Sequence, residues 1–222
     1  IRIGIADSHP ENACSYYRSF GPLMKIKEIA LQSIDVNKIS WLAMNNIDIL
    51  YIGRPDNINF LTLIELAKNM NLPVWVDWDD NILDLPLYNP AYNHFEKTKD
   101  VIIKILKLAD IVTVTTKELK ESFILHNDNI KIIPNSWNDF NFPFNKKSND
   151  NKSVLWRGSD THRGDLLSVL TGMTSVSKKF PEWMFLFMGC NTWYITDFLQ
   201  KSHNLDGMLL LHFFKLLKES NA

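Results

Sequence analysis

The sequence predicts an α/β protein, in which one complete, doubly wound parallel-sheet domain precedes the start of a second domain of the same kind. Short β-branched runs alternate with longer segments of helical periodicity, and parallel strands need such crossover helices between them. A stretch rich in Asn, Lys, Ser and Asp over residues 139–152 interrupts this alternation, which then restarts. We therefore expect an N-terminal domain over residues 1–138, a linker over 139–152 and the beginning of a second domain over 153–222.

Six strands are expected in the first domain. Most are short runs of β-branched and aromatic residues that end in turn-forming residues, such as Ile47–Ile52 before Gly53-Arg54-Pro55. After the linker, Ser153–Trp156 and Trp183–Met188 repeat the pattern. The six expected ranges in the first domain are Ile1–Asp7, Glu28–Ile34, Ile47–Ile52, Pro73–Asp77, Ile111–Thr115 and Ile130–Ile133.

The helices between these strands are predicted from apolar spacing and from capping residues. Asp35 is a suitable N-cap for a helix that runs to Met44, whereas Gly21-Pro22 should break or restart the helix around it. The spacing of Phe60, Leu63 and Ile64 places all three on one helical face. The expected ranges are Tyr16–Ile26, Asp35–Met44, Asn59–Asn69, Asn93–Leu108, Lys117–His126 and Gly164–Lys179.

Composition and charge exclude several classes of protein. The 222 residues are 45% hydrophobic and 22% charged, which is typical of a globular chain rather than a disordered one. Lys plus Arg number 24 and Asp plus Glu 25, so a net charge of −1 gives no global attraction to nucleic acid or anionic membranes. Cys14 and Cys190 follow no metal or redox spacing, and we expect two reduced thiols.

The sequence contains neither an apolar run long enough to span a bilayer nor a recognisable secretory signal. We therefore expect a cytoplasmic protein without a transmembrane segment. Because the first expected strand starts at Ile1, we also expect the N-terminus to have been processed or trimmed.

The first candidate site is the polar segment that follows the first strand, residues 7–21. Ligands of open α/β sheets gather at the carboxyl ends of the strands, and Tyr16, Tyr17, Arg18 and Gly21 follow such an end. The segment lacks the G-x-G-x-x-G pattern of dinucleotide-binding proteins. The alternative is a polar surface loop that caps a helix, and we favour ligand contact.

The second candidate site is Asp77-Trp78-Asp79-Asp80, which follows the fourth strand. Asp79 and Asp80 could contact a ligand, or one of them could cap a short turn over residues 81–84. The Trp78 ring could stack on a base or a sugar. A carboxylate cluster could also hold Mg²⁺ or Mn²⁺, which leaves a metal-dependent phosphohydrolase as a lower alternative, although we expect no metal here.

The third candidate site is the segment from Trp156 to Asp165. A strand, a glycine-containing loop and a helix N-terminus in succession form an arrangement that binds phosphate through backbone N–H groups. Basic side chains in the segment could donate further hydrogen bonds to a phosphate, although the G-K-[ST] ending of a Walker A loop is missing. The alternative is an ordinary strand-to-helix turn capped by Asp160 or Thr161. The residues expected to contact phosphate are Arg157, Gly158, Ser159, His162 and Arg163.

Four segments together resemble a known family. They are VDWDDNILDLP (76–86), ADIVTVTTKEL (109–119), IKIIPNS (130–136) and LWRGSDTHRGDL (155–166). In this order they are similar to GT-B glycosyltransferases of the retaining "group 1", family 4-like type of bacteria and phages. The resemblance extends from the first strand to about Gly189.

The resemblance implies two Rossmann-like domains that face each other across a cleft, with the acceptor on the N-terminal side and a nucleotide-diphosphate sugar on the C-terminal side. It implies metal-independent sugar transfer without an obligate cofactor. Asp79, Asp80 and His162 would be catalytic, Gly158, His162 and Arg163 would approach the donor diphosphate, and residues 16–18, Gly21, Trp78 and Asn135 would line the cleft. The acceptor stays open between a glycan, a lipid-linked sugar, a protein and a modified DNA base, and the oligomeric state also stays open.

The acidic E-x7-E segment of that family has no counterpart before Ala222. The resemblance therefore implies a GT-B protein truncated at its C-terminus. The alternative is a non-catalytic protein that binds a nucleotide or a sugar on a truncated GT-B scaffold.

Overall fold

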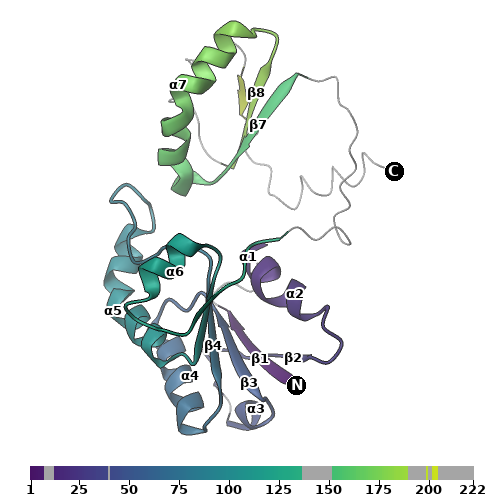
Figure 1. Cartoon of the computed structure of the whole chain (residues 1–222), viewed down its shortest axis with the longest axis vertical. Helices are drawn as coiled ribbons and strands as arrows, with labels where there is room; N and C mark the ends of the chain where they lie inside the picture. The colour runs from purple at the N-terminus through teal and green to yellow at the C-terminus, as the bar shows by residue number, and fades with distance from the viewer. Residues whose placement is uncertain (8–12, 40, 137–151, 190–198, 200–201, 205–222) are drawn as a thin grey trace. The chain divides into compact units, whose positions relative to one another are not determined.

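The computed structural model describes residues 1–7, 13–39, 41–136, 152–189, 199 and 202–204 (Figure 1). The chain divides into two compact units, one within residues 1–143 and one within 144–222. The short segment Pro86–Ala91 groups with the second unit. The predicted linker over residues 139–152 lies outside the described residues except for Lys152, so the predicted domain boundaries stay a prediction. Each unit is described by itself.

The first unit is built on a six-stranded sheet in which every pair of neighbours is parallel. The strand order is β2-β1-β3-β4-β5-β6. The chain therefore passes from β1 to one side for β2 and then crosses to the other side for β3. The strands are β1 (Arg2–Asp7), β2 (Ala30–Ser33), β3 (Ile49–Gly53), β4 (Val74–Trp78), β5 (Ile111–Val114) and β6 (Ile130–Ile132).

Helices cover both faces of this sheet, which is the doubly wound arrangement (Figure 1). One face packs against α4 (Ile58–Asn69), α5 (Tyr92–Leu108) and α6 (Lys117–Phe123), and α3 (Trp41–Asn45) adds Met44 to this core. The other face carries α1 (Ala13–Ser15), the π-helical turn η1 (Tyr16–Phe20) and α2 (Gly21–Leu23), which bury Leu23 with Ile3, Ile5 and Tyr51.

The second unit contains a smaller parallel sheet in the order β7-β8-β9. Its strands are β7 (Ser153–Arg157), β8 (Met184–Met188) and β9 (Ser202–Asn204). A short 3₁₀ turn, η2 (Asp160–His162), leads from β7 into α7 (Arg163–Lys179). Leu166 of α7 packs on Phe185, Phe187 and Leu199 to form the core of this unit.

The structure confirms the predicted α/β class and the doubly wound parallel sheet. One local prediction is wrong. Asp35 caps only a turn, since its carboxylate accepts a hydrogen bond from Asn37 N, and α3 begins at Trp41. Gly21-Pro22 restarts the helical segment, as predicted, because the π-helical turn η1 ends at Phe20 and α2 begins at Gly21 with Pro22 in its first turn. Among the described residues, no helix is long and apolar enough to cross a membrane.

Candidate functional site

The carboxyl ends of the parallel strands meet at one edge of the large sheet. β1 ends at Asp7, β3 at Gly53 and β4 at Trp78, and these three strands are neighbours. β2 is added on one side of β1 and β3 on the other, so the order in which strands are added reverses between β1 and β3. Ligands of open α/β sheets bind in the crevice at such a reversal. Residues 8–12 of the first candidate segment, which follow β1 directly, lie outside the described residues.

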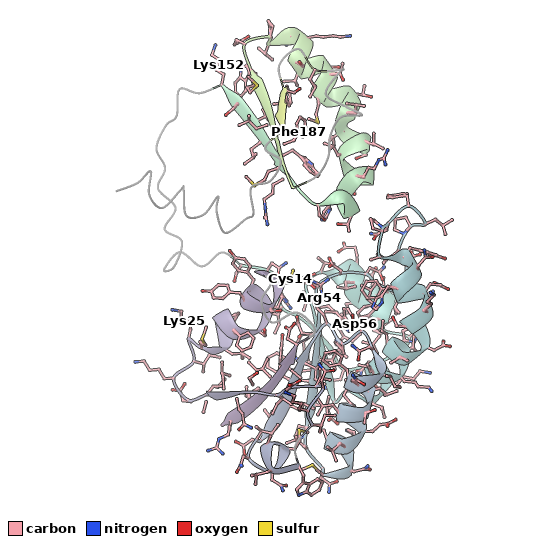
Figure 2. All side chains as sticks on the ribbon, turned by 180° about the vertical axis from the view of Figure 1, so that it is seen from behind. Cys14, Lys25, Arg54, Asp56, Lys152 and Phe187 are labelled. Carbon is pink, nitrogen blue, oxygen red and sulfur yellow. The ribbon has the colours of Figure 1, made fainter. Side chains whose placement is uncertain are left out.

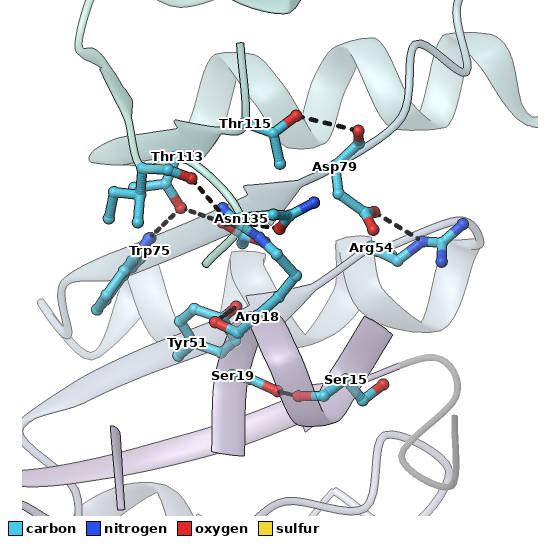
Figure 3. A network of polar contacts seen from close by, with 12 residues as sticks. Ser15, Arg18, Ser19, Tyr51, Arg54, Trp75, Asp79, Thr113, Thr115 and Asn135 are labelled. Atoms are coloured by element: carbon cyan, nitrogen blue, oxygen red, sulfur yellow. Dashed lines mark hydrogen bonds and ion pairs between the residues drawn. The ribbon is translucent and has the colours of Figure 1, made fainter. Parts of the chain in front are cut away.

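A buried polar network joins η1 to the strand ends at this edge (Figure 3). Arg18 donates two hydrogen bonds to Asp77, from Nε to Oδ2 at 2.9 Å and from Nη2 to Oδ1 at 2.6 Å. Its Nη1 also donates to the Ile133 carbonyl at 2.6 Å and to Asn135 Oδ1 at 3.2 Å. The Thr113 hydroxyl donates to Asp77 Oδ1 at 2.5 Å. One guanidinium thereby connects three separate segments.

The Arg18–Asp77 pair at the centre of this network is closed to solvent and makes several hydrogen bonds. The Arg18 and Asp77 side chains are only 6% and 2% exposed. Burial raises the pKa of the Asp77 carboxyl above its ordinary value, and the hydrogen bonds from Arg18 and Thr113 oppose that rise. Trp75 Nε1 donates to Thr113 Oγ1 at 2.8 Å, and the Tyr51 hydroxyl donates to the Arg18 carbonyl at 3.3 Å.

The prediction that Arg18 lines an open cleft is therefore wrong. Its guanidinium is used by Asp77, Ile133 and Asn135, so its effect on a ligand has to be indirect, through the position of η1. Asn135 is exposed and lies beside Arg18, at the end of the chain segment that follows β6. The sequence separation between Arg18 and Asn135, 117 residues, explains why no local pattern predicts this contact.

Arg54 organises a second, more open group of charges at the same edge (Figure 3). Its Nε lies 3.3 Å from Asp79 Oδ1, and its Nη2 donates to Asp80 Oδ2 at 3.1 Å. The side chains are 20% exposed for Arg54, 10% for Asp79 and 60% for Asp80. Two further contacts fix the backbone, because Arg54 N donates to the Asp77 carbonyl at 2.9 Å and Thr115 Oγ1 to the Asp79 carbonyl at 3.2 Å.

The Cys14 thiol belongs to this second group (Figure 2). Burial, together with the neighbouring negative charge of Asp79, raises the pKa of Cys14 to about 11. The thiol therefore stays protonated at neutral pH and is a poor nucleophile. In the part of the chain that the structure describes, Cys14 is a free cysteine, as the sequence predicts.

Trp78 does not reach this edge, and its predicted role in stacking on a ligand is wrong. Its side chain is 0% exposed and belongs to the main core. Side chains alternate along a strand, so Trp78 follows Val74 and Val76 onto the face covered by α4 and α5, whereas Asp77 points to the other face.

The aromatic part of the first candidate site lies on η1. Tyr16 and Tyr17 are half-buried, and their rings meet edge to face with centroids 5.4 Å apart. Gly21 is required by close packing, because a Cβ there would lie 2.6 Å from the Tyr16 carbonyl oxygen. Of the residues predicted to line the cleft, Tyr16 and Tyr17 are the ones on this turn with side-chain surface available for a ligand.

The predicted phosphate loop forms the carboxyl end of the small sheet. Gly158 follows β7, and its N–H donates to the Met188 carbonyl at 3.0 Å. Ser159 and His162 lie between it and the first turn of α7, and Arg157 and Arg163 are exposed on either side. His162 Nδ1 lies 2.8 Å from Asp165 Oδ2, so the imidazole is oriented by a carboxylate on the same helix.

Two glycines approach each other beside this loop. A Cβ at Gly158 would lie 2.5 Å from the Trp156 ring, and one at Gly189 would lie 2.8 Å from the Gly158 carbonyl oxygen. Gly189 also has a φ of +90°, a conformation that favours glycine. The residues that follow β7 and β8 therefore pack closely against each other and against the Trp156 ring, next to the start of α7.

The described residues contain no group of three or more His, Cys, Asp or Glu side chains that could hold a metal ion. Asp77 is used by Arg18, and Asp79 and Asp80 share Arg54. An arginine therefore occupies the position that a cation would need between these carboxylates.

Arg54 and Thr113 are not among the residues that the sequence predicts for the site. The sequence places Arg54 in the turn that closes β3, directly after a strand end at the ligand edge. Its φ of +51° is rare for a residue with a side chain, and such conformations concentrate at functional sites. Thr113 precedes the end of β5, and only its pairing with Asp77 in the sheet register reveals its partner.

Comparisons with known proteins bear on the fold. No protein-family model matches the sequence, and no curated protein matches it. A structure from Listeria monocytogenes, assigned as a UDP-N-acetylglucosamine 2-epimerase, is similar with a TM-score of 0.57 and 15% identity, over 98% of this chain and 71% of that one. A structure of MnaA from S. aureus with UDP is similar with a TM-score of 0.54 and 11% identity, over 97% of this chain and 70% of that one.

The chain has a GT-B-like fold. This likeness agrees with the fold that the sequence motifs imply. At 15% and 11% identity it shows the fold alone, so what those two proteins bind or catalyse does not carry over by similarity.

Proposed function

We propose that this protein uses a nucleotide-diphosphate sugar and transfers its sugar to an acceptor hydroxyl, on a GT-B-like scaffold. The observation that carries the proposal is the segment between β7 and α7. It combines glycine backbone, the N-terminus of a 17-residue helix and two exposed arginines. N–H groups in the first turn of a helix have no intrahelical acceptor, and the helix dipole favours an anion there.

A diphosphate suits this segment chemically. Arg157 and Arg163 can each offer two parallel N–H donors to phosphate oxygens. At Gly158 the Trp156 ring takes the space that a side chain would fill, which holds the loop backbone beside the start of α7. As the sugar leaves, negative charge grows on the diphosphate, and donors already in place stabilise that charge without reorganisation.

The remaining predicted residues fit a division of labour. Asp79 and Asp80 would contact the acceptor or the transferred sugar, His162 would contact the donor, and Tyr16 and Tyr17 would supply an aromatic surface for a sugar ring. In this proposal the protein is cytoplasmic and needs neither a metal nor a further cofactor. The acceptor is a glycan, a lipid-linked sugar, a protein or a modified DNA base.

A second candidate is a nucleotide-sugar 2-epimerase. The specific observation in its favour is that a protein assigned to that activity covers 98% of this chain in structural comparison. Both candidates need a nucleotide diphosphate in the same kind of site. They differ in products, because transfer or hydrolysis releases the nucleoside diphosphate whereas epimerisation returns an intact nucleotide sugar.

Product analysis separates the candidates. The protein is incubated with a panel of UDP-, ADP-, GDP- and TDP-sugars, with and without sugar acceptors, and products are followed by ¹H and ³¹P NMR. We expect release of the nucleoside diphosphate, and Arg163→Ala should lower kcat/KM at least about tenfold, whereas Lys178→Ala at the other end of α7 should leave it unchanged. Formation of the sugar epimer would instead support the second candidate, 2-epimerisation. Binding of a nucleotide sugar without turnover would overturn both proposed enzyme activities. Equal kcat/KM for Arg163→Ala and the unmodified protein would contradict the phosphate role.

A further inference from the structure

Arg54 forms ion pairs with two consecutive carboxylates, Asp79 and Asp80. Its left-handed backbone and the hydrogen bond from its N–H to the Asp77 carbonyl hold it directly beside the end of β4. The guanidinium contacts Asp79 through Nε and Asp80 through Nη2. Two different nitrogens therefore fix two neighbouring side chains.

The two carboxylates are in different environments. Asp79 is nine-tenths buried, and among the residues that the structure describes its Oδ1 accepts no hydrogen bond, although Arg54 Nε lies 3.3 Å away. Asp80 is 60% exposed and reaches water directly. A buried carboxylate oxygen without a donor costs free energy unless a ligand supplies one.

Asp79 lies among several charged and titratable groups. The charged and titratable groups that interact with it or face it include two carboxylates and two arginines, and of these Arg54 is the cation in direct contact. The groups are Cys14 on α1, Arg18 on η1, Tyr51 and Arg54 at β3, and Asp77 and Asp80 at β4. Arg18 is already bonded to Asp77, which leaves Arg54 as the group that can balance Asp79.

We propose that Arg54 is a positioning residue, which holds Asp79 in place so that its Oδ1, which accepts no hydrogen bond from the described residues, accepts one from a sugar hydroxyl. The proposal deepens the proposed function and rests on it. In the transfer step, Asp79 takes the proton of the acceptor hydroxyl while that oxygen bonds to the anomeric carbon. The bond from the anomeric carbon to the diphosphate oxygen breaks, and the nucleoside diphosphate leaves with the electron pair.

A purely structural ion pair would have different consequences. It would hold the β3 and β4 ends together, and its loss would lower stability and ligand affinity together. A positioning role instead changes the proton affinity of Asp79 and the rate of the step that uses it. The buried Oδ1 of Asp79 favours the positioning role, because an ion pair that only stabilises the fold does not require an acceptor without a hydrogen-bond donor.

The test compares Arg54→Gln, which removes the charge, with Arg54→Lys, which keeps it. The control is Lys68→Gln, which breaks another ion pair of the same sheet, between Lys68 and Asp110 before β5. We expect Arg54→Gln to lower kcat about tenfold or more with little change in KM, and to move the acidic limb of the pH–rate profile up by about one pH unit. Arg54→Lys should restore the position of that limb, and Lys68→Gln should change neither quantity.

A titration of the Asp79 carboxyl by ¹³C NMR, with its resonance assigned through Asp79→Asn, gives a readout without substrate. A midpoint that rises in Arg54→Gln and returns in Arg54→Lys supports the proposal even if the unmodified protein shows no turnover, in which case only the proposed function fails. An unchanged midpoint overturns the proposal. Parallel losses of KM, kcat and melting temperature, with an unmoved acidic limb, would also overturn it and assign Arg54 a structural role.

Discussion

Two arginines at the same edge of the large sheet are used in opposite ways. Arg18 donates four hydrogen bonds to three residues and is almost fully buried with Asp77. Arg54 holds two carboxylates with one contact each, one of them exposed and the other with an oxygen that accepts no hydrogen bond from the described residues. A saturated network fixes the backbone, whereas an unsaturated one offers acceptors to a ligand.

The difference follows from the position of each arginine along the backbone. Arg18 comes from η1, packed on the face of the sheet, and its side chain reaches Asp77 in β4 and the chain segment that follows β6. Arg54 comes directly after β3 and remains at the rim, where one-fifth of its side chain is exposed. The same residue type therefore anchors the fold in one position and prepares a site in the other.

Removal of Arg18 should have the largest effect on stability. Arg18→Met leaves the buried Asp77 carboxylate without its cation, which typically costs about 3–5 kcal/mol. Denaturant unfolding of the first unit should show this loss, and the double variant with Asp77→Asn should recover part of it, because the uncompensated charge is gone. A loss below about 1 kcal/mol would mean that the network does not anchor η1.

Removal of Arg54 should cost less stability. Arg54→Met should lower the free energy of unfolding by about 1–2 kcal/mol, because water reaches Asp80 and part of the guanidinium. The same denaturation experiment measures it next to Arg18→Met. If the two variants were equally destabilised, the distinction between an anchoring and a site-forming arginine would be lost.

The sequence predicts the sheet well because each strand carries its own local signal. β-branched runs and turn residues predict all six strands of the first unit within a few residues, and helical periodicity predicts α4 and α5. The prediction for Asp35–Met44 fails because the Asp35 side chain bonds two residues on and forms a turn instead of a helix N-cap. Local sequence signals therefore predict whether a segment is a helix or a strand more reliably than they predict where it begins.

The site is less predictable because its contacts are not local. Arg18 and Asp77 are 59 residues apart, and Arg54 and Asp80 are 26 apart, so no spacing along the chain marks them as partners. Trp78 could have been placed correctly from alternation along β4, since Val74 and Val76 share its face. The sequence signal for Arg54 is its position directly after a strand that ends at the ligand edge.

A ¹⁵N–¹H NMR titration with UDP tests the central claim, nucleotide-diphosphate binding at the start of α7, most directly. We expect concentration-dependent shifts of the backbone amides of Ser159, Arg163 and Gly164, and we expect these shifts to be lost in Arg163→Ala but not in Lys178→Ala. Unchanged amide positions across residues 158–166 at millimolar UDP would contradict it.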